Sequence, residues 1–207
     1  MLAIDGLGLG GAEMVVRDLA RGLDARSFDV SICCTKGLGG SVGETLLRDG
    51  YDVFVLPGQT DHKVDYLTAL KFRRAIVDRK IDVVHTHATP ALLDAAPCRV
   101  ADRRLRLVHT FHFGNYPYDH WRHHLLELIC ARGVDRLIAV GWDQQRRIST
   151  AYHLPSSRVA VIWNGITVGN AAADTSFRAA IGTGERLLVG TVAKLIEQKG
   201  LDLPGRP

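Results

Sequence analysis

The chain has 207 residues, of which 46% are apolar and 23% are charged, and its formal net charge is +4. This composition is ordinary for a globular protein, and the length allows a substantial buried core. The mild basic excess suits a phosphate-bearing ligand or an anionic membrane surface, but no run of basic residues interleaved with aromatics indicates a nucleic-acid partner.

The cysteines, the apolar runs and the first residues together predict a cytoplasmic protein. The four cysteines form no C-x-x-C pair, and Cys33 and Cys34 are adjacent, so we interpret all four as small buried residues in a reducing compartment. No apolar run approaches the roughly 18 residues that a membrane-spanning helix needs. The start of the chain lacks the basic region and long apolar core of a signal peptide.

Strand and helix patterns alternate along the first 165 residues. The predicted strands cover residues 2–5, 28–35, 51–57, 82–87, 104–112, 134–140 and 158–165. The predicted helices cover residues 12–23, 43–50, 65–79, 90–103, 118–132 and 142–152. Pro97 is expected to kink or interrupt the fourth helix. Strands that alternate with helices predict an α/β, Rossmann-like fold, with a parallel sheet covered by helices on both faces.

The pattern changes after residue 165. Residues 166–185 are small, polar and weakly patterned, with one short helix near Phe177, and we interpret them as a linker. Residues 186–195 predict a fresh strand, but a lone strand and a loop cannot form a domain. We therefore expect an N-terminal domain over 1–165 and the incomplete start of a second Rossmann-like domain over 186–207.

The segment GLGLGG, residues 6–11, fits the G-x-G-x-x-G pattern of phosphate-binding loops. It lies between the first strand and the first helix, where glycines let a ligand approach the backbone and free helix N–H groups face an anion. A nicotinamide site also needs an acidic residue at the end of the second strand. Asp29 lies at the start of that strand instead, although Lys36 near its end suits the 2′-phosphate of NADP. An NAD(P)-binding oxidoreductase, a flavin site, a structural turn and another phosphate site are the alternatives.

Histidine is concentrated in one part of the chain. Seven of the nine histidines fall between residues 85 and 124, namely His85, His87, His109, His112, His120, His123 and His124. A metal site needs three or four convergent ligands, but no carboxylate pattern and no H-E-x-x-H motif accompanies them, so we predict no metal. We interpret His85, His120, His123 and His124 as polar residues at a strand end or on a solvated helix face.

Six short segments, in order along nearly the whole chain, resemble glycosyltransferase family 4, whose members are retaining enzymes with the GT-B fold. The segments are GGAE (10–13), DVVHTH (82–87), LVHTFH (107–112), RLIAV (136–140), VIWNGI (161–166) and VGTVAKLIEQKGLD (189–202). The resemblance implies the acceptor-side half of an enzyme that moves a sugar from a nucleotide-sugar to a hydroxyl. The acceptor would be a glycan or a lipid-linked molecule.

The resemblance also implies donor-binding residues. Gly10 and Gly11 would approach the phosphates of the nucleotide-sugar. Lys194 and Lys199 stand where the family has the Arg and Lys that neutralise the diphosphate leaving group, where negative charge develops. The family's Glu-x7-Glu donor segment would lie beyond residue 207, so we expect little transferase activity from this chain alone.

His112 matches the family's histidine after the fifth strand, near the donor phosphate and the acceptor hydroxyl, and is the candidate catalytic residue. His87 and Asn115 are assigned to the acceptor side. The resemblance implies neither a cofactor nor a metal. The helix that carries Trp121 and Leu125 is a candidate for peripheral contact with the inner membrane surface. A further alternative is a non-catalytic half-protein that pairs with a separate C-terminal domain and would expose an apolar face.

Overall fold

The computed structural model describes residues 1–57, 67–112, 121–166, 176–182, 184, 186–187 and 189–190. The chain divides into two compact units, Met1–Ile166 and Thr167–Pro207. Within the described residues, no helix combines the length and apolar character that crossing a membrane requires.

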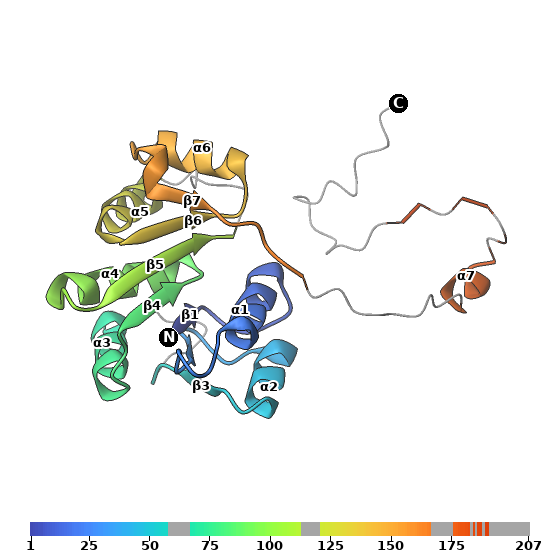
Figure 1. Ribbon diagram of the computed structural model, residues 1–207, viewed down its shortest axis with the longest axis horizontal. Helices are drawn as coiled ribbons and strands as arrows, with labels where there is room; N and C mark the ends of the chain where they lie inside the picture. The colour runs from blue at the N-terminus through green and yellow to red at the C-terminus, as the bar shows by residue number, and fades with distance from the viewer. Residues whose placement is uncertain are drawn as a thin grey trace. The chain divides into compact units, whose positions relative to one another are not determined.

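The first unit is built on a parallel sheet of seven strands within the described residues (Figure 1). The strands are β1 Leu2–Ile4, β2 Ser31–Cys34, β3 Asp52–Val55, β4 Val83–Thr86, β5 Arg106–Phe111, β6 Arg136–Ala139 and β7 Val159–Val161. Their order is β3-β2-β1-β4-β5-β6-β7, and all neighbouring pairs are parallel. The strand order therefore reverses between β1 and β4, and open α/β sheets bind ligands at the carboxyl ends of the strands beside such a reversal.

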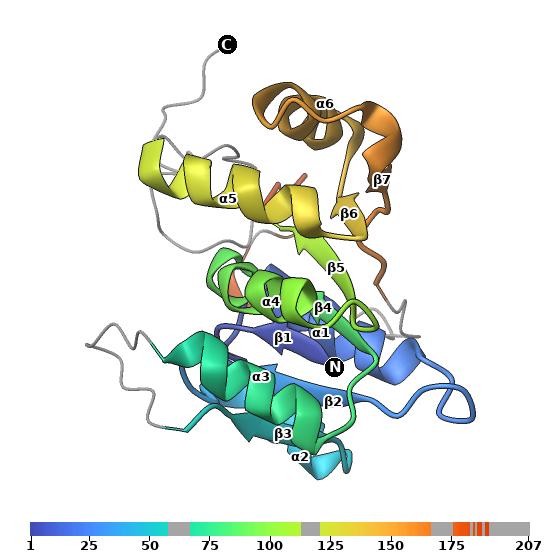
Figure 2. The same ribbon diagram turned by 90° about the vertical axis from the view of Figure 1, so that its left-hand side faces the viewer.

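Helices connect the strands and cover the sheet. They are α1 Gly11–Gly22, α2 Gly40–Arg48, α3 Thr68–Asp78, α4 Thr89–Ala101, α5 Trp121–Gly133 and α6 Trp142–Ala151. The helices α3, α4 and α5 lie in front of the sheet in Figure 2, and α1 and α2 lie behind it. The α/β, Rossmann-like fold predicted from the sequence is confirmed.

Two apolar cores lie on opposite faces of the sheet because side chains alternate along each strand. Leu2 and Ile4 of β1 pack with Val16 of α1 in one core. Ala3, between them, packs in the other core with Phe72 of α3 and residues of α4 to α6. Complete burial of a side chain such as Phe72 contributes about 1.5–3 kcal/mol to folding.

The predicted interruption at Pro97 does not occur, since α4 runs through Pro97 from Thr89 to Ala101. A proline inside a helix costs about 3 kcal/mol. Ala95, Ala96 and Cys98, on either side of it, are buried in the core. Burial of this face offsets the lost backbone hydrogen bond, as tertiary packing commonly does in helices.

Two strands are shorter than the sequence predicts. The predicted strand at 28–35 begins only at Ser31, because the N–H groups of Ser27 and Phe28 both donate to the carbonyl of Asp24 and form a turn. The strand predicted at 158–165 begins at Val159 and ends at Val161, before the Asn-Gly pair.

In the second unit, the short helix expected near Phe177 is α7, Ser176–Ala180. The described residues of the strand predicted at 186–195, which are Arg186, Leu187, Val189 and Gly190, are not in a strand. Residues 191–207 lie outside the described residues. The predicted limits of the linker and of the second domain stay predictions.

Candidate functional site

The glycine-rich loop after β1 is held in place by the loop after β2. Leu7 is completely buried between them. Its N–H donates to the carbonyl of Leu38 at 3.0 Å, and its own carbonyl accepts from the N–H of Gly43 at 3.2 Å. These bonds fix the middle of the segment that leads into α1.

Glycine is required where the two loops touch. A Cβ on Gly6 would lie 3.0 Å from the carbonyl oxygen of Gly37, and one on Gly40 would lie 3.1 Å from Cα of Gly8. Gly40 also has a φ of +77°, which residues other than glycine rarely adopt. The second loop, residues 37–40, therefore supports the first, a role that sequence reasoning missed although the GLGG pattern signalled a close backbone contact.

The start of α1 contains both predicted phosphate-binding glycines. Gly10 is the extended residue before the helix, and Gly11 is the first helical residue. A Cβ on Gly10 would collide with the side chain of Glu13, which folds back over the helix start, whereas a Cβ on Gly11 would meet nothing within 4 Å. The carboxylate thus lies at the positive end of α1, and the backbone at Gly11 faces open space.

Lys36, the residue that suited an NADP phosphate, is engaged within the protein. Its Nζ lies 2.8 Å from Oδ2 of Asp5, and the hydroxyl of Thr35 donates to the other oxygen of the same carboxylate at 3.2 Å. Thr35 and Lys36 directly follow β2, in the place where a nicotinamide site has its ribose-binding acid. The local chemistry therefore gives no support to a nicotinamide site.

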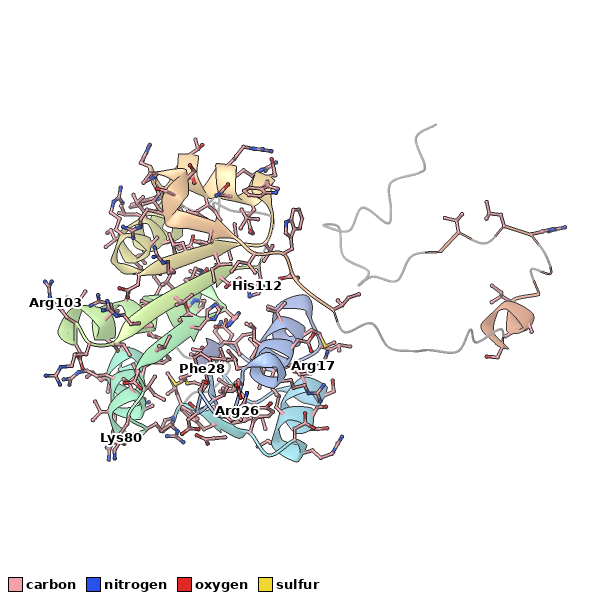
Figure 3. The ribbon with its side chains drawn as sticks, viewed as in Figure 1. Arg17, Arg26, Phe28, Lys80, Arg103 and His112 are labelled. Atoms are coloured by element: carbon pink, nitrogen blue, oxygen red, sulfur yellow. The ribbon has the colours of Figure 1, made fainter. Side chains whose placement is uncertain are left out.

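The structure brings His87 and His112 together. His87 follows β4, His112 follows the neighbouring β5, and Nδ1 of His87 lies 2.8 Å from Nε2 of His112. Their rings are stacked, with centroids 5.1 Å apart. His87 is 1% exposed, and His112 is partly exposed at the carboxyl end of β5 (Figure 3). Among the described residues, Nε2 of His87 and Nδ1 of His112 are buried and have no hydrogen-bond partner.

A second pair lies directly behind the first on the same face of the sheet. The ring of His85 lies 4.1 Å from that of His87, and its Nε2 is hydrogen-bonded to Oγ1 of Thr110 at 2.8 Å. The period of two along a strand places both histidines of the H-x-H motif beside Thr110 and His112 of the T-x-H motif. Sequence reasoning missed Thr110, although this spacing was the signal for it.

The opposite face of the same strands holds a third polar pair. Thr86 of β4 is hydrogen-bonded through Oγ1 to Nδ1 of His109 of β5 at 2.8 Å. The edge of the completely buried His109 ring meets Phe111, with centroids 4.5 Å apart. This histidine belongs to the core rather than to the site.

All four of these imidazoles are neutral at pH 7. Burial lowers the pKa of His85 and of His112 to about 4 and that of His109 to about 3, and it holds the pKa of His87 well below its ordinary value. Neighbouring imidazoles lower the pKa of His85, His87 and His109 further. A neutral imidazole offers one donor and one acceptor, so the histidines contribute hydrogen bonds and no positive charge at this edge.

A buried carboxylate fixes the start of α4, directly after His87. Glu127 of α5 is completely buried and accepts hydrogen bonds from the hydroxyls of Thr89 and Tyr152, each at 2.5 Å. Thr89 begins α4, and Tyr152 follows α6. Glu127 therefore joins three helices. Sequence reasoning missed it, although a lone acid within the apolar run LLELIC was a signal.

An aromatic side chain covers the start of α6 at the same edge of the sheet. A Cβ on Gly141, the residue before α6, would lie 3.6 Å from the ring of Trp163. Trp163 follows β7 and is 65% exposed. Ile162, the residue before Trp163, and Trp142, the first residue of α6, are exposed as well. These residues form an exposed apolar group beside the site.

Other predicted residues do not enter the described site. Asn115, Lys194, Lys199 and His120 lie outside the described residues. His124 lies against Tyr152, with ring centroids 5.3 Å apart, rather than on a solvated helix face. Among the described residues, no group of three or more His, Cys, Asp or Glu side chains is arranged to hold a metal ion.

A cavity of about 390 Å³ lies at the opposite edge, beside the amino ends of β1, β2 and β4. Its walls include Phe28, Asp29, Lys80 and Asp82, and the ammonium of Met1 nearby donates to the carbonyl of Val83. Open α/β sheets bind their ligands at the carboxyl ends of the strands. The histidine pair and the glycine loop, at that other end, are therefore the candidate site.

The sequence that carries this site matches a known family. The family model for Glycosyltransferase Family 4 matches residues 9–169, which include the end of the glycine loop at Gly10 and Gly11, both histidines and Trp163. This chain belongs to Glycosyltransferase Family 4. The resemblance to this family is thereby confirmed, and five of the six segments lie within the matched residues, whereas residues 189–202 lie outside them.

Solved structures show the same fold. HepE from Anabaena, in complex with UDP and glucose, is 21% identical and has a TM-score of 0.75, with 97% of this chain and 55% of that chain covered. The lipopolysaccharide outer core galactosyltransferase WaaB, in its apo form, is 14% identical with a TM-score of 0.60, over 82% and 47% of the two chains. MurG from Acinetobacter baumannii is 13% identical with a TM-score of 0.55, over 82% and 46%.

These likenesses establish a GT-B, Rossmann-like fold for the family member described here. The chain spans about half the length of the solved proteins that it matches. No curated protein matches the chain.

Proposed function

We propose that this family member is the acceptor-side half of a glycosyltransferase that transfers a sugar from a nucleotide-sugar to a hydroxyl, with retention of configuration. The observation that carries the proposal is the His87–His112 pair at the carboxyl ends of β4 and β5, within the region that the family model matches. The complexes of HepE with UDP and with UDP-glucose support a uridine nucleotide-sugar as the donor.

The described residues suit this chemistry. The first N–H groups of α1, at Gly11, have no partner within the helix and attract an anion, which would displace the Glu13 carboxylate from this helix start. A neutral His112 exchanges hydrogen bonds with hydroxyls of the sugar or the acceptor without adding charge. In the proposed enzyme, Lys194 and Lys199 neutralise the diphosphate as it leaves, and neither a metal nor a cofactor is needed.

Binding of UDP-glucose to the purified chain is the direct test. We expect UDP-glucose to shift the amide resonances of Gly10, Gly11 and His112, whereas NADPH should leave them unchanged. Gly11→Ala adds a Cβ that meets nothing within 4 Å, so it should preserve the fold and weaken binding by obstructing the phosphates. Gly22→Ala, at the other end of α1 and equally open, is the matched control. Shifts of the same loop by NADPH alone would favour the oxidoreductase instead.

We also propose that α5 rests on a membrane surface near a lipid-linked acceptor. Trp121, Leu125 and Ile129 recur every four residues on this helix, so they share one face, and Trp121 and Ile129 are 65% and 60% exposed. Exposed apolar side chains on one helix face favour contact with the lipid interface.

Sedimentation with phosphatidylglycerol vesicles tests this contact. Ile129→Lys should reduce the bound fraction because it places a charge on the apolar face. Val100→Lys changes a valine on α4 that is 76% exposed, more than Ile129, and should leave binding unchanged. Equal sedimentation of both variants and the parent chain would contradict a specific role for α5.

The exposed group of Trp142, Ile162 and Trp163 favours a second candidate, a half-protein that pairs with a separate C-terminal domain. Co-expression with the C-terminal half of a family relative tests it. A complex that elutes together on size exclusion, and that Trp163→Ser weakens, is the expected outcome for this candidate. Separate elution would leave the nucleotide-sugar function as the better account.

A further inference from the structure

We infer that Trp163 forms a saccharide subsite, in which its indole stacks on a sugar ring of the acceptor some distance from the reacting hydroxyl. The acceptor is then an oligosaccharide or the end of a glycan rather than a single sugar. The inference rests on the proposed sugar transfer, for which it names the acceptor class. It also gives the exposed group around Trp163 a different occupant from a separate C-terminal domain.

The strand register places the subsite at the level of the histidine pair. Phe111 of β5 pairs with Ala139 of β6, and Ala139 pairs with Val161 of β7. His112 and Ile162 are the next residues after Phe111 and Val161, and the N–H of Ile162 donates to the carbonyl of Ala139 at 2.9 Å. Neighbouring strands lie about 4.8 Å apart, so the backbones at His112 and Ile162 are about 10 Å apart. A single sugar ring does not bridge this distance, whereas a short oligosaccharide does.

The strand order assigns this side of the edge to the acceptor. The glycine loop follows β1, the histidine pair follows β4 and β5, and Trp163 follows β7. In the order β1-β4-β5-β6-β7, the histidine pair therefore lies between the glycine loop and Trp163. A donor whose phosphates bind at the glycine loop and whose sugar reaches His112 leaves the side of β6 and β7 to the acceptor.

The indole of Trp163 is supported from below and remains accessible. A Cβ on Gly141 would lie 3.6 Å from Cζ3 and 3.8 Å from Cη2 of the ring, so the backbone before α6 lies in contact with its six-membered part. Nevertheless, Trp163 is 65% exposed, and Trp142, the residue after Gly141, is 57% exposed. Exposed apolar groups beside a site mark binding surfaces.

The chemistry of these residues suits a sugar ring. A pyranose carries C–H groups on its faces and hydroxyls around its rim, so it binds best to an apolar surface bordered by hydrogen-bonding groups. An indole combines an apolar face with one N–H donor, and the N–H of Trp163 is free of any hydrogen bond within the described part of the chain. Asn164, which follows Trp163 and is exposed, adds an amide with donors and an acceptor.

Titration of the full ¹⁵N-labelled chain with maltotetraose, cellotetraose and chitotetraose tests the subsite. At least one of them should shift the indole N–H of Trp163 and the amides of Gly141 and Asn164, and glucose should shift them less at the same concentration. Trp163→Ala should weaken binding about tenfold because the apolar surface is lost. Trp163→Phe keeps a flat ring and should recover most of the affinity.

Phe28→Ala is the matched control. Phe28 is an aromatic residue that is 53% exposed and lines the cavity at the opposite edge of the sheet, so its removal should leave tetrasaccharide binding unchanged. An absence of shifts at Trp163 with all three tetrasaccharides would overturn the inference. Equal affinities of the parent chain and Trp163→Ala would do the same.

UDP-glucose binding, measured on the same samples, separates the subsite from the proposed function. If a tetrasaccharide binds at Trp163 and UDP-glucose does not bind, the proposed sugar transfer fails and the saccharide subsite stands. If UDP-glucose shifts the glycine loop and no tetrasaccharide binds, the subsite fails and the proposed transfer stands. If a C-terminal half covers Trp163 and no tetrasaccharide shifts it, the exposed group belongs to domain pairing and the inference fails.

Discussion

The polar groups at the two ends of strands β4 to β6 differ in charge. At the carboxyl end, the rings of His85, His87 and His112 are neutral, with His87 buried and the other two partly buried. At the amino end, Asp135 is charged and accepts hydrogen bonds from Arg99 at 2.9 Å, from Arg106 at 3.2 Å and from the N–H of Leu107 at 2.9 Å.

The difference separates a binding edge from a structural edge. The hydrogen bond with Arg99, above all, lowers the pKa of Asp135 to about 2, so this carboxylate is charged and fully paired. At the other end, ring nitrogens of His87 and His112 have no partner among the described residues. Satisfied groups stabilise a fold, whereas unsatisfied buried groups at a strand end are places where a ligand can supply the missing partner.

Acidification should cause the largest change in the free energy of unfolding, through the histidines. The pKa of His109 is about 3 in the folded chain and about 6.5 in an unfolded one, so the unfolded state takes up a proton first as the pH falls. Stability is therefore complete above about pH 6.5 and is lost as the pH falls below it. From pH 7 to 5 each such histidine should cost roughly 2 kcal/mol.

Urea unfolding at pH 7, 6 and 5 measures this loss. His109→Asn keeps a group near Nδ1 for Thr86 but cannot titrate, so its stability should vary less with pH than that of the wild type. His153→Asn should show the wild-type pH dependence. A free energy of unfolding that is constant between pH 7 and 5 would show that the histidines are not buried as neutral rings.

Removal of the Glu127 carboxylate should have the next largest effect. Glu127→Ala leaves the hydroxyls of Thr89 and Tyr152 without this acceptor inside the core and also opens a cavity. We expect a loss of about 3–4 kcal/mol in the free energy of unfolding. Glu127→Gln keeps the volume and one acceptor, so it should lose less. Equal losses in thermal denaturation of the two variants would contradict this expectation, because they would mean that neither the retained volume nor the amide oxygen stabilises the core.

Asp135→Asn tests the structural edge directly. The substitution removes the charge that Arg99 and Arg106 share, and we expect a loss of about 1–2 kcal/mol at pH 7, reduced by partial solvent screening. Because the folded pKa is about 2, against about 3.9 unfolded, this contribution is present above pH 4 and disappears as the pH falls toward 2. Asp24→Asn, which breaks an exposed pair with Arg26, should change nothing measurable. A pH-independent loss in Asp135→Asn would contradict the assignment.

Gly40→Ala should have an effect on stability as small as that of Asp135→Asn, together with a local effect on the site. Its φ of +77° and the contact with Gly8 make a Cβ unfavourable by about 1–2 kcal/mol. Gly37→Ala, where a Cβ meets nothing within 4 Å, is the control. Amide shifts in the first loop should appear only in Gly40→Ala, and shifts of equal size in both variants would show that the loops do not support each other there.

The local patterns of the sequence determined the fold class, the places of the strands and helices, and the family. Periods of 2 and 3.6 residues are properties of short segments, so they are readable without the partners of those segments. The predictions of element limits were wrong where those limits depend on residues outside the short segment. The start of β2 depends on a turn at Asp24, and the continuity of α4 through Pro97 depends on the core beneath it.

The tertiary structure alone decided which residues act together. His87 and His112 are 25 positions apart, and Thr89, Glu127 and Tyr152 come from the ends or middle of three helices. Only the parallel pairing of β4 with β5 brings the two histidines to one edge, and only helix packing brings the two hydroxyls to one carboxylate. A sequence shows which side chains can form hydrogen bonds, but strand order and packing determine the partners, because these contacts join segments that no local pattern connects.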